Sequence, residues 1–600
     1  MGNRTVYSVL LETSNQFASR PALHQPAKGS SGEKYRTWNW IEYRQAVEEV
    51  ACGLRLLGVR KKDVVALGSE TRAEFYFADL GIMTAGAVAA AMYTSYPPEE
   101  DVRTLRACGA KFVLVEDLEM LTRLRAAGGD SLGVHWGVLT GEAPGAYSLD
   151  SIRELGRKAM LEDPFMLRRL QEEVTPADYA ILYLTSGATG EPKMVHVTHE
   201  ALVANMDMGP VVLHFTPEEC ALAFLPSAHI AQRIGIELIP LRIGLQVYFS
   251  ESLSRMPAEF RSVRPSLFLG PPRVWERIYA SISMEIRKRG AFIRQLFYGA
   301  LGVGLEASKL RRQGRPIPLW MRQVLKLADA VLFRKIRDRF GGRLHVPVSG
   351  AAPLSKQLGE FYEVIGMPLI EGYGLTEGGI VILNPLNAPR PGFIGKPLPG
   401  VEVKLGEDGE LLLKSPTVMT GYLNDPEATA EVLRDGWLHT GDLAEIGSDG
   451  YLAITGRKKE MIVSSNGKKI YPSRVEALFK TEPIISQMIL VGDRQPYVTA
   501  LFTINPAAAE SLRGMDSYRG RPMAELVTAK PVFEEVRKAV KKANQQLAPF
   551  EQIRKFRILE RDFSLEEGEL TATMKVRRTR VLSNFGSTIG DLYSGNQEGQ

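Results

Sequence analysis

The sequence has little cysteine, no long apolar run and almost no excess charge. Its three cysteines, Cys52, Cys108 and Cys220, lie far apart and form no C-x-x-C pair, which argues against a disulfide framework or a zinc knuckle and favours a reducing compartment. The longest apolar run, residues 80–92, is too short to span a bilayer, and the N-terminus lacks the apolar stretch of a signal peptide. A net charge of +5 over 600 residues does not by itself indicate a nucleic-acid-binding protein.

The composition is that of an ordinary globular protein that is too long for a single core. Hydrophobic residues make up 44% of the chain and charged residues 24%, so we expect two or more domains. Helical patterns alternate with short apolar runs such as VVALGS (64–69), KFVLVED (111–117) and AILYLTSG (180–187). This alternation predicts an α/β fold, in which ligand sites gather where strands end.

The sequence pattern changes at two points along the chain. Residues 281–340 have a long helical pattern rich in Lys and Arg, which is either a solvated helix face or a contact with an anionic membrane or phosphate. After TGRKKE, a smaller run of strand, helix and strand begins. We therefore predict a large N-terminal domain over 1–456, with a helical insert at about 281–340, and a small α+β domain over 457–600.

The stretch TSGATGEPK, residues 185–193, crowds hydroxyl residues, glycines and a lysine after an apolar run. A Gly-rich loop between a strand and a helix exposes backbone N–H groups, and Lys193 at its far end can neutralise phosphate charge. The loop is not a Walker A motif, because Glu191 and Pro192 separate Gly190 from the lysine. A hydrophilic surface loop without a ligand is the alternative.

This loop is followed, in order, by further motifs over about the last two thirds of the chain. They are LPSAHIAQR (225–233), VSGAAPLS (348–355), EGYGLTEGG (371–379), GWLHTGDLAEIGSDGYLAITGRKKE (436–460) and LTATMKVRR (570–578). The series resembles the adenylate-forming superfamily of acyl-CoA synthetases, peptide-synthetase adenylation domains and luciferases. The LP-x-AHIA-x-R form, the helical insert and the TATMKVRR ending are similar to the long-chain fatty acyl-CoA synthetase branch.

The resemblance implies a fold, a reaction and a set of partners. The fold would be a large N-terminal domain of β-sheets flanked by helices, with a small mobile α+β domain that turns about a hinge near Lys459. The reaction would be ATP- and Mg²⁺-dependent ligation of a fatty acid to coenzyme A through an acyl-adenylate. We expect these small-molecule substrates, no nucleic acid, and a cytoplasmic location or a peripheral one on the inner face of a membrane, contacted through the basic insert.

The resemblance also assigns the nucleotide contacts. The β- and γ-phosphates would meet Thr185, Ser186, Gly187, Thr189, Gly190 and Lys193. Ala188 stands where Ser or Thr is common, and the lost hydroxyl contact would weaken ATP binding by about 1 kcal/mol. Magnesium would bind Thr185 and Glu377, the α-phosphate Thr376, and the ribose Asp442 assisted by Arg457. The adenine would lie against Gly350, Ala351, Ala352 and Tyr373, with Glu371, Gly372 and Gly374 in the same nucleotide-binding segment.

The remaining assignments concern the chemistry and the acid. Lys575 matches the catalytic lysine that bridges the carboxylate and the α-phosphate, and Thr185, Glu377 and His229 complete the catalytic set. His229 resembles the residue at the mouth of the acyl pocket, although a satisfied strand-end histidine is an equally good interpretation. Rotation about Lys459 would present the loop around Gly467 for thioester formation. Acyl-tunnel candidates are Phe224, Trp275, Phe297 and Leu301, which the sequence does not separate from core residues.

Two other interpretations stay open. The chain could adenylate another carboxylic acid or pass its acyl group to a carrier-protein thiol. It could also be a non-catalytic member that binds a nucleotide or acyl group and uses the basic insert as a membrane or partner surface, with Ala188 as a sign of decay. Retention of Lys575, Glu377 and Asp442 argues against the second.

Overall fold

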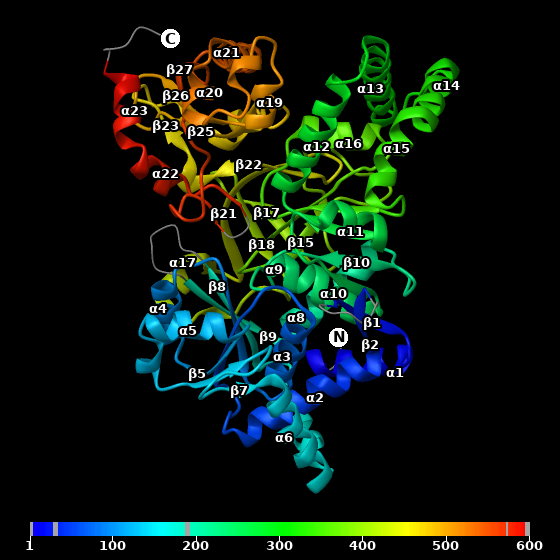
Figure 1. Cartoon of the computed structure of the whole chain (residues 1–600), viewed down its shortest axis with the longest axis vertical. Coiled ribbons are helices and arrows are strands. Elements are labelled where there is room, and N and C mark those ends of the chain that lie inside the picture. The colour runs from blue at the N-terminus through cyan, green and yellow to red at the C-terminus, as the bar shows by residue number, and fades with distance from the viewer. Residues whose placement is uncertain (1–3, 28–33, 186–192, 572–573, 595–600) are drawn as a thin grey trace.

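Two large sheets form the framework of the N-terminal part of the molecule (Figure 1). The computed structural model describes residues 4–27, 34–185, 193–571 and 574–594. Within these residues the first sheet contains, in spatial order, β16 (Lys396–Pro397), β15 (Gly379–Leu383), β14 (Ile370–Leu375), β13 (Val346–Ser349), β12 (Leu267–Gly270), β10 (Cys220–Ala223), β11 (Gln246–Phe249), β1 (Pro21–Pro26) and β2 (Tyr35–Asn39). The second contains β19 (Gly421–Tyr422), β9 (Lys193–Thr198), β8 (Tyr179–Thr185), β4 (Val88–Met92), β3 (Val64–Gly68), β5 (Ala110–Val115), β6 (His135–Val138) and β7 (Tyr147–Ser148).

The centres of both sheets are parallel and buried, as the short apolar runs of the sequence predict. Strands β3 and β4 pair in parallel, and every residue of both is buried. Parallel strands need covering helices on both faces, which explains why these runs do not alternate with polar residues. The helices of this part include α1 (Val6–Phe17), α2 (Trp40–Leu56), α3 (Ala73–Thr84), α4 (Pro98–Cys108), α5 (Leu118–Ala126), α6 (Leu149–Glu162), α7 (Met166–Glu173), α8 (His199–Val212), α9 (Ile230–Gln232), α10 (Ile239–Ile243) and α11 (Met256–Val263). The α/β expectation is confirmed.

The predicted basic insert is a group of helices at the edge of this framework. Its members are α12 (Pro272–Arg287), α13 (Ala291–Arg312), α14 (Leu319–Ala328) and α15 (Arg334–Arg337), which precede α16 (Lys356–Val364). Figure 1 shows α13 and α14 at the upper right, on the same side of the large sheets as the C-terminal region. Residues 313–318, which contain Pro316 and Pro318, separate α13 from α14, as the GRPIP break predicts.

A smaller sheet and the C-terminal elements complete the chain. The smaller sheet has β17 (Glu402–Leu405), β18 (Glu410–Lys414), β21 (Trp437–Ile446), β20 (Leu433–Arg434) and β22 (Leu452–Arg457), with α17 (Pro426–Val432) beside it. The C-terminal region contains β23 (Ile462–Val463), β24 (Lys469–Ile470), β25 (Ile485–Val491), β26 (Val498–Ile504) and β27 (Ile553–Ile558), with α18 (Pro472–Ala477), α19 (Pro506–Glu510), α20 (Met523–Thr528), α21 (Lys530–Asn544), α22 (Arg578–Asn584) and α23 (Gly586–Tyr593).

The C-terminal region has its own hydrophobic cores. Two clusters of buried residues are drawn wholly from residues 462 onward: one includes Val475 and Phe502, and the other includes Leu501 and Val581. A separate core lets a region keep its structure while it moves as a unit. The domain boundary near residue 457 and the hinge at Lys459, which lies in the short helical turn Lys458–Glu460, stay predictions that this packing supports.

Polar contacts join the C-terminal region to the larger part. Arg273 of α12 donates from Nη2 to the Ser486 hydroxyl at 2.7 Å, and Lys480 lies 3.4 Å from the Glu276 carboxylate of the same helix. On another side, Arg577 donates to the Tyr96 hydroxyl at 3.4 Å. These contacts consist of ion pairs and hydrogen bonds, which break more readily than a buried apolar interface.

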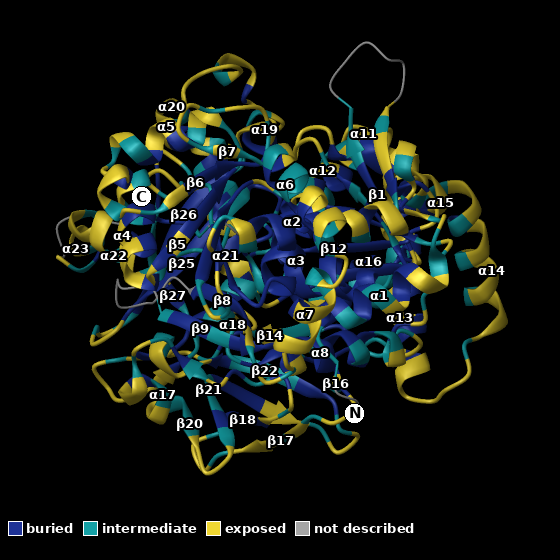
Figure 2. Ribbon diagram, turned by 90° about the horizontal axis from the view of Figure 1, so that it is seen from below, coloured by how far each residue is buried: buried dark blue, intermediate teal, exposed yellow. Residues whose placement is uncertain are grey.

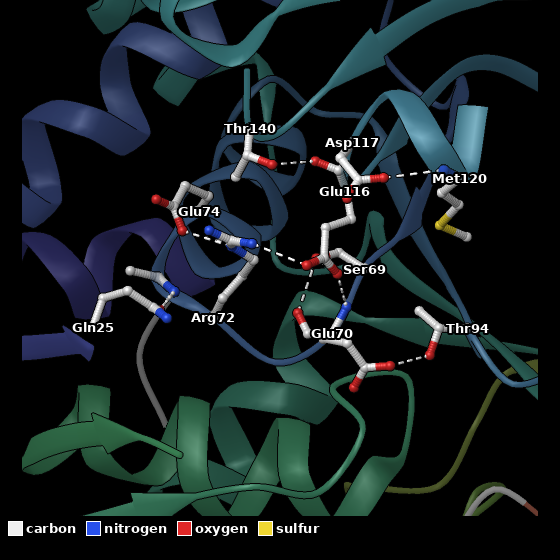
Figure 3. A network of polar contacts seen from close by, with 11 residues as sticks. Gln25, Ser69, Glu70, Arg72, Glu74, Thr94, Glu116, Asp117, Met120 and Thr140 are labelled. Atoms are coloured by element: carbon white, nitrogen blue, oxygen red, sulfur yellow. Dashed lines mark hydrogen bonds and ion pairs between the residues drawn. The ribbon is translucent and has the colours of Figure 1, made fainter. Parts of the chain in front are cut away.

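Polar residues at the ends of β3, β4 and β5 bond mostly to one another (Figure 3). Arg72 forms ion pairs with Glu74 and Glu116, and a Glu116 carboxylate oxygen accepts the backbone N–H of Glu70 at 2.8 Å. The Thr94 hydroxyl donates to Glu70. These strand ends are therefore occupied by a structural network, and the ligand-binding candidates lie elsewhere.

Candidate active site

The segment TSGATGEPK connects two antiparallel strands. Strand β8 ends at Thr185 and β9 begins at Lys193, and these two residues are register partners. The helix expected after the loop is absent at this point: strand β9 intervenes, and α8 begins only at His199. Strand pairing thus fixes the backbone of Lys193. The predicted contacts Ser186, Gly187, Thr189 and Gly190, and the side chain of Thr185, lie outside the described residues, as does Ala188.

Tyr422 links the lysine of this loop to the predicted magnesium ligand. The Lys193 ammonium lies 4.6 Å from the centroid of the Tyr422 ring. The hydroxyl of the same ring donates to Oε1 of Glu377 at 2.8 Å. Burial and the Glu377 charge raise the pKa of Tyr422 above its ordinary value, so the hydroxyl keeps its proton. Tyr422 has no signal in the sequence, because 45 residues separate it from Glu377. The Met419 N–H donates to the Glu377 carbonyl at 2.8 Å and joins the two segments.

Asp442 is a buried carboxylate held by two donors. The Tyr373 hydroxyl donates to its Oδ2 at 2.7 Å, and Nε of Arg457 donates to its Oδ1 at 2.6 Å. Burial alone would lower the pKa of Arg457, but the Asp442 charge and hydrogen bond raise it overall. Asp442 therefore sits with one donor on each oxygen, and a carboxylate offers about four acceptor directions, so it can accept further hydrogen bonds. The structure brings together the three residues Tyr373, Asp442 and Arg457 that the sequence predicts to hold a nucleoside.

The charges of Asp442 and Arg457 affect the pKa of Lys575. Burial lowers the pKa of Lys575 first, the nearby Arg457 lowers it further, and the Glu460 and Asp442 carboxylates raise it in part. The short segment that carries it is bent back on itself, since Thr571 donates its N–H to the Lys575 carbonyl at 2.8 Å. The preceding residue, Met574, has a φ of 65°. A charged side chain of the C-terminal region is thus electrostatically coupled to Asp442 and Arg457.

A mostly apolar cavity lies beside this polar cluster. Its empty space, with the open mouth included, is about 840 Å³. Its wall includes His229, Gly235, Leu269, Val348 and Ile380. The predicted nucleotide-binding segments contribute Gly350, Ala351, Gly372, Tyr373 and Gly374 to the wall, and Tyr373 also contacts Asp442. His229 accepts the Ala231 N–H at 3.1 Å, and burial lowers its pKa to about 4, which keeps it neutral near pH 7.

Two wall features follow from local backbone requirements. Ala351 has a φ of 69°, a conformation that costs an L-residue roughly 1–2 kcal/mol, so its surroundings must hold it there. Asn205 of α8 donates to the Ile380 carbonyl at 2.6 Å and accepts the Ile380 N–H at 2.9 Å, which fixes this helix against β15. Asn205 had no signal in the sequence, because a lone Asn inside a helical pattern resembles a solvated side chain.

The proposed tunnel residues belong to a core. Trp275 and Phe297 are buried in a hydrophobic cluster with Phe268, while Phe224 and Leu301 pack against it. None of the four contributes to the wall of the cavity. Large aromatic side chains fill space, whereas a ligand cavity is bounded here by glycines and medium-sized aliphatic residues. These four residues do not line this cavity, and their place in an acyl tunnel stays a prediction.

The other predicted residues occupy exposed or separate positions. Thr376 and Glu377 lie in the turn after β14. Gly467, with a φ of 74°, makes the exposed turn between β23 and β24, where its N–H donates to the Ser464 carbonyl at 2.8 Å. Ala352 follows Ala351 in the loop after β13 but is absent from the cavity wall.

Glu371 differs from its neighbours on β14. Its side chain is buried, accepts the Gly392 N–H at 3.1 Å and does not reach the cavity wall. Burial raises its pKa from 4.5 to about 8, so the group is largely neutral at pH 7. Glu371 thus bonds to the backbone at Gly392, and its role in nucleotide binding stays a prediction.

We expect Glu371 to make the folded protein less stable as the pH rises. The folded pKa lies above the unfolded one, so the stabilisation is complete below pH 4.5 and is lost between pH 4.5 and about 8. The loss in the free energy of unfolding should be on the order of 5 kcal/mol. Chemical denaturation of the wild type and of Glu371→Gln over this range measures it. The Gln variant should show a shallower decline, and identical slopes for the two proteins would contradict the assignment.

The family models agree with this geometry. Residues 10–423 match the model described as AMP-binding enzyme, and residues 459–597 match the AMP-binding enzyme C-terminal domain. The chain therefore belongs to the AMP-binding enzyme family, a class of two-part adenylate-forming proteins. Its relatives include the long-chain-fatty-acid–CoA ligase FadD15 of Mycobacterium tuberculosis, which is 34% identical over 93% of each chain. The rat long-chain-fatty-acid–CoA ligase ACSBG1 is 28% identical over 98% of this chain and 85% of its own length.

Solved structures share the fold at lower sequence identity. The adenylation domain of a carboxylate reductase from Mycobacterium chelonae has a TM-score of 0.75 at 21% identity, covering 99% of this chain and 92% of that one. The anthranilate CoA ligase AuaEII, solved with anthranoyl-AMP, has a TM-score of 0.72 at 19% identity, covering 97% of each chain. At such identities the likeness supports the fold alone.

Proposed function

We propose that the protein is a long-chain fatty acid:CoA ligase that works through an acyl-adenylate. The observation that carries the proposal is the double role of Tyr373, which lines the apolar cavity and donates its hydroxyl hydrogen bond to Asp442. An apolar chain in the cavity and a nucleoside on Asp442 would therefore meet at one place. The similarity to proteins named long-chain-fatty-acid–CoA ligases supports the same acid and the same acceptor.

The first half-reaction joins two anions, so the site must neutralise charge. A carboxylate oxygen of the acid attacks the α-phosphorus of ATP, and pyrophosphate leaves. Lys193 on one side and Lys575 on the other are the cations that we assign to the phosphates and to the reacting carboxylate. In the second half-reaction the thiol of coenzyme A loses its proton and attacks the acyl carbonyl, and AMP leaves.

The residues present fit a nucleotide and its metal. Asp442 retains acceptor capacity for two ribose hydroxyls, and Gly441 beside it has open space where a side chain would stand. Among the described residues no group of three acidic, His or Cys side chains forms a ready-made metal site, so Mg²⁺ held by Glu377 would draw its other ligands from phosphate and water. When bound, the ion would neutralise phosphate charge. Thr185 and Thr376 complete the proposed metal and α-phosphate contacts.

Replacing Tyr422 by phenylalanine should weaken the response to magnesium. The change removes the hydrogen bond that orients Glu377 but keeps the ring beneath Lys193. We expect the Mg²⁺ concentration at half-maximal pyrophosphate release to rise about tenfold or more, as is usual when an outer partner of a metal ligand is lost. Tyr451→Phe, which removes a hydroxyl bonded to the Ala388 carbonyl, is the matched control. If the wild type and both variants depended equally on the Mg²⁺ concentration, Tyr422 would have no role in magnesium binding.

Movement of the C-terminal region belongs to the same proposal. We infer that its described position, with Lys575 near Asp442, serves adenylation, and that rotation near Lys459 brings the Gly467 turn to the site for the thioester step. Alternation of this kind would shield the mixed anhydride from water between the two half-reactions.

The test is CoA-dependent AMP release with saturated acids of graded chain length. Activity that peaks with long chains supports the proposal. Pyrophosphate exchange that depends on an acid without CoA turnover would indicate a different acceptor, such as a carrier-protein thiol. Binding of ATP without pyrophosphate release for any acid would indicate a non-catalytic member of the family.

Location is the last part of the proposal. No helix in the described residues combines the length and the apolar character needed to cross a bilayer. Long-chain acids partition into membranes, so we propose a protein of a reducing compartment that meets its substrate by peripheral contact with a membrane, through the basic insert.

A further inference from the structure

The helices α13 and α14, with the corner that joins α12 to α13, leave large apolar side chains uncovered. All ten residues from 287 to 296 are exposed, and they include Phe292, whose surface is 77% accessible. On α14, Leu319 is 76% and Trp320 57% exposed, and Leu327 is 62% exposed. Figure 2 draws α14 largely exposed at the edge of the molecule. Single exposed apolar residues are common on protein surfaces, but a group of this size on neighbouring helices marks an interaction site.

The exposed residues have the spacing of a helix face. Trp320, Val324, Leu327 and Val331 follow one another by four, three and four positions, which places them on one side of α14 and its continuation. The rings of Phe297 and Phe333 meet with centroids 6.2 Å apart, so the beginning of α13 lies beside the end of this stretch. The apolar side chains at the start of α13 and those along α14 thus belong to one antiparallel pair of helices.

The same helices carry a large excess of positive over negative charge. Residues 281–340 contain 14 Lys or Arg and 4 Asp or Glu, a net charge of +10, whereas the whole chain carries only +5. The remainder is therefore negative. Several of the basic residues are exposed and have no ion pair within the described part of the chain, namely Arg287, Lys288, Arg294, Arg315, Arg322, Lys326, Arg334 and Lys335.

Charge and apolar surface in this arrangement match one kind of partner. Exposed aromatic and aliphatic side chains interleaved with unpaired Lys and Arg are typical of helices that lie in the interface of a membrane with anionic lipids. The apolar residues would enter the boundary of the acyl chains, while the long basic side chains reach the phosphate groups. A solvated helix face, the simpler interpretation of the basic residues, does not explain Phe292, Leu319, Trp320 and Leu327.

We propose that α13, α14 and the α12–α13 corner form a docking surface for the face of an anionic lipid bilayer. The benefit of docking, uptake of fatty acid from the bilayer, rests on the proposed ligase function, but the docking itself does not. The surface makes binding depend on both anionic headgroups and apolar insertion.

Sedimentation of the full-length protein with vesicles tests the proposal. Wild-type protein should bind vesicles of phosphatidylcholine with phosphatidylglycerol, bind pure phosphatidylcholine at least tenfold more weakly, and lose affinity as salt rises. Arg322→Glu with Lys326→Glu should reduce the partition coefficient at least tenfold, since each basic residue near the surface contributes about fivefold. Trp320→Ser with Leu327→Ser should reduce it by a similar factor.

Matched control residues lie outside the proposed docking surface. Leu161 and Phe165, at 77% and 63% exposure, are equally open, so Leu161→Ser with Phe165→Ser should leave binding unchanged. Arg103→Glu with Lys111→Glu reverses the same amount of charge at exposed positions outside the docking surface, so it should also leave binding unchanged. Unchanged melting temperatures would show that the variants are folded.

Three outcomes would overturn the proposal. They are a wild type that binds no vesicles, vesicle binding that survives both surface variants, and a surface that instead drives self-association, seen as a concentration-dependent mass lost in Trp320→Ser with Leu327→Ser. AMP release with fatty acid supplied on cyclodextrin, without vesicles, should be unaffected in these variants. Failure of that reaction in the wild type would count against the ligase and leave the vesicle result standing.

Discussion

Replacing Lys575 by alanine is expected to slow pyrophosphate release by a factor of about 100 to 1,000. Removal of one charged group that stabilises a transition state typically has an effect of this size. Lys575 is the single lysine of TATMKVRR, and its pKa responds to the charges of Asp442 and Arg457. Thioester formation from supplied acyl-adenylate should be nearly unchanged, because that step does not use the lysine.

The control is the exposed neighbour Arg580, whose Nε donates to the Glu567 carbonyl. Arg580→Ala should retain normal pyrophosphate release. The pH profile adds a second readout: because burial and Arg457 lower the pKa of Lys575, adenylation should decline on the alkaline side before an ordinary lysine would lose its proton. Normal pyrophosphate release by Lys575→Ala would refute the assignment.

Changing Asp442 to asparagine should raise the KM for ATP by roughly tenfold to a hundredfold. Hydrogen bonds to a charged acceptor contribute about 1.5–3 kcal/mol each, and the amide cannot accept from two ribose hydroxyls while it retains both Tyr373 and Arg457. The effect should fall on ATP binding more than on kcat at saturating ATP, because the ribose does not react.

Asp449→Asn serves as the matched control. Asp449 lies in the segment after β21 and also forms an ion pair with an arginine, Arg390. The double variant Asp442→Asn with Arg457→Gln separates ribose contact from pairing with arginine. If the two changes act through the ion pair alone, the double variant would be no worse than either single one. Direct titration of ATP binding checks the KM values, and an unaltered affinity in Asp442→Asn would end the ribose assignment.

The sequence predicted the parts of the fold and the site that depend on local pattern. Buried parallel strands appear as short apolar runs, and VVALGS and KFVLVED became β3 and β5. Motif residues that lie next to one another, such as Gly372 to Gly374, are also close in space. Tyr373, Asp442 and Arg457 are far apart in the chain, and their grouping came from the family resemblance.

The parts that the sequence left open depend on packing across the chain. A strand and a helix both suit the residues after a glycine-rich loop, and the pairing of Lys193 with Thr185 decides for the strand. Trp275 and Phe297 looked suitable for an acyl tunnel because apolar residues fill cores and cavities alike. Tyr422 and Asn205 act through single hydrogen bonds to distant elements, and such bonds leave no periodic signal in a sequence.

The contacts between α12 and the C-terminal region have a kinetic consequence. Glu276 forms ion pairs with Lys480 and with Arg273, and Arg273 in turn donates to Ser486, so one carboxylate lies at the centre of these contacts. If the C-terminal region rotates between half-reactions, these contacts must break once in every turnover. Because salt screens ionic contacts, the rate of this movement should depend on ionic strength. At low salt the C-terminal region would stay longer in the adenylating position, and at high salt it would leave that position sooner.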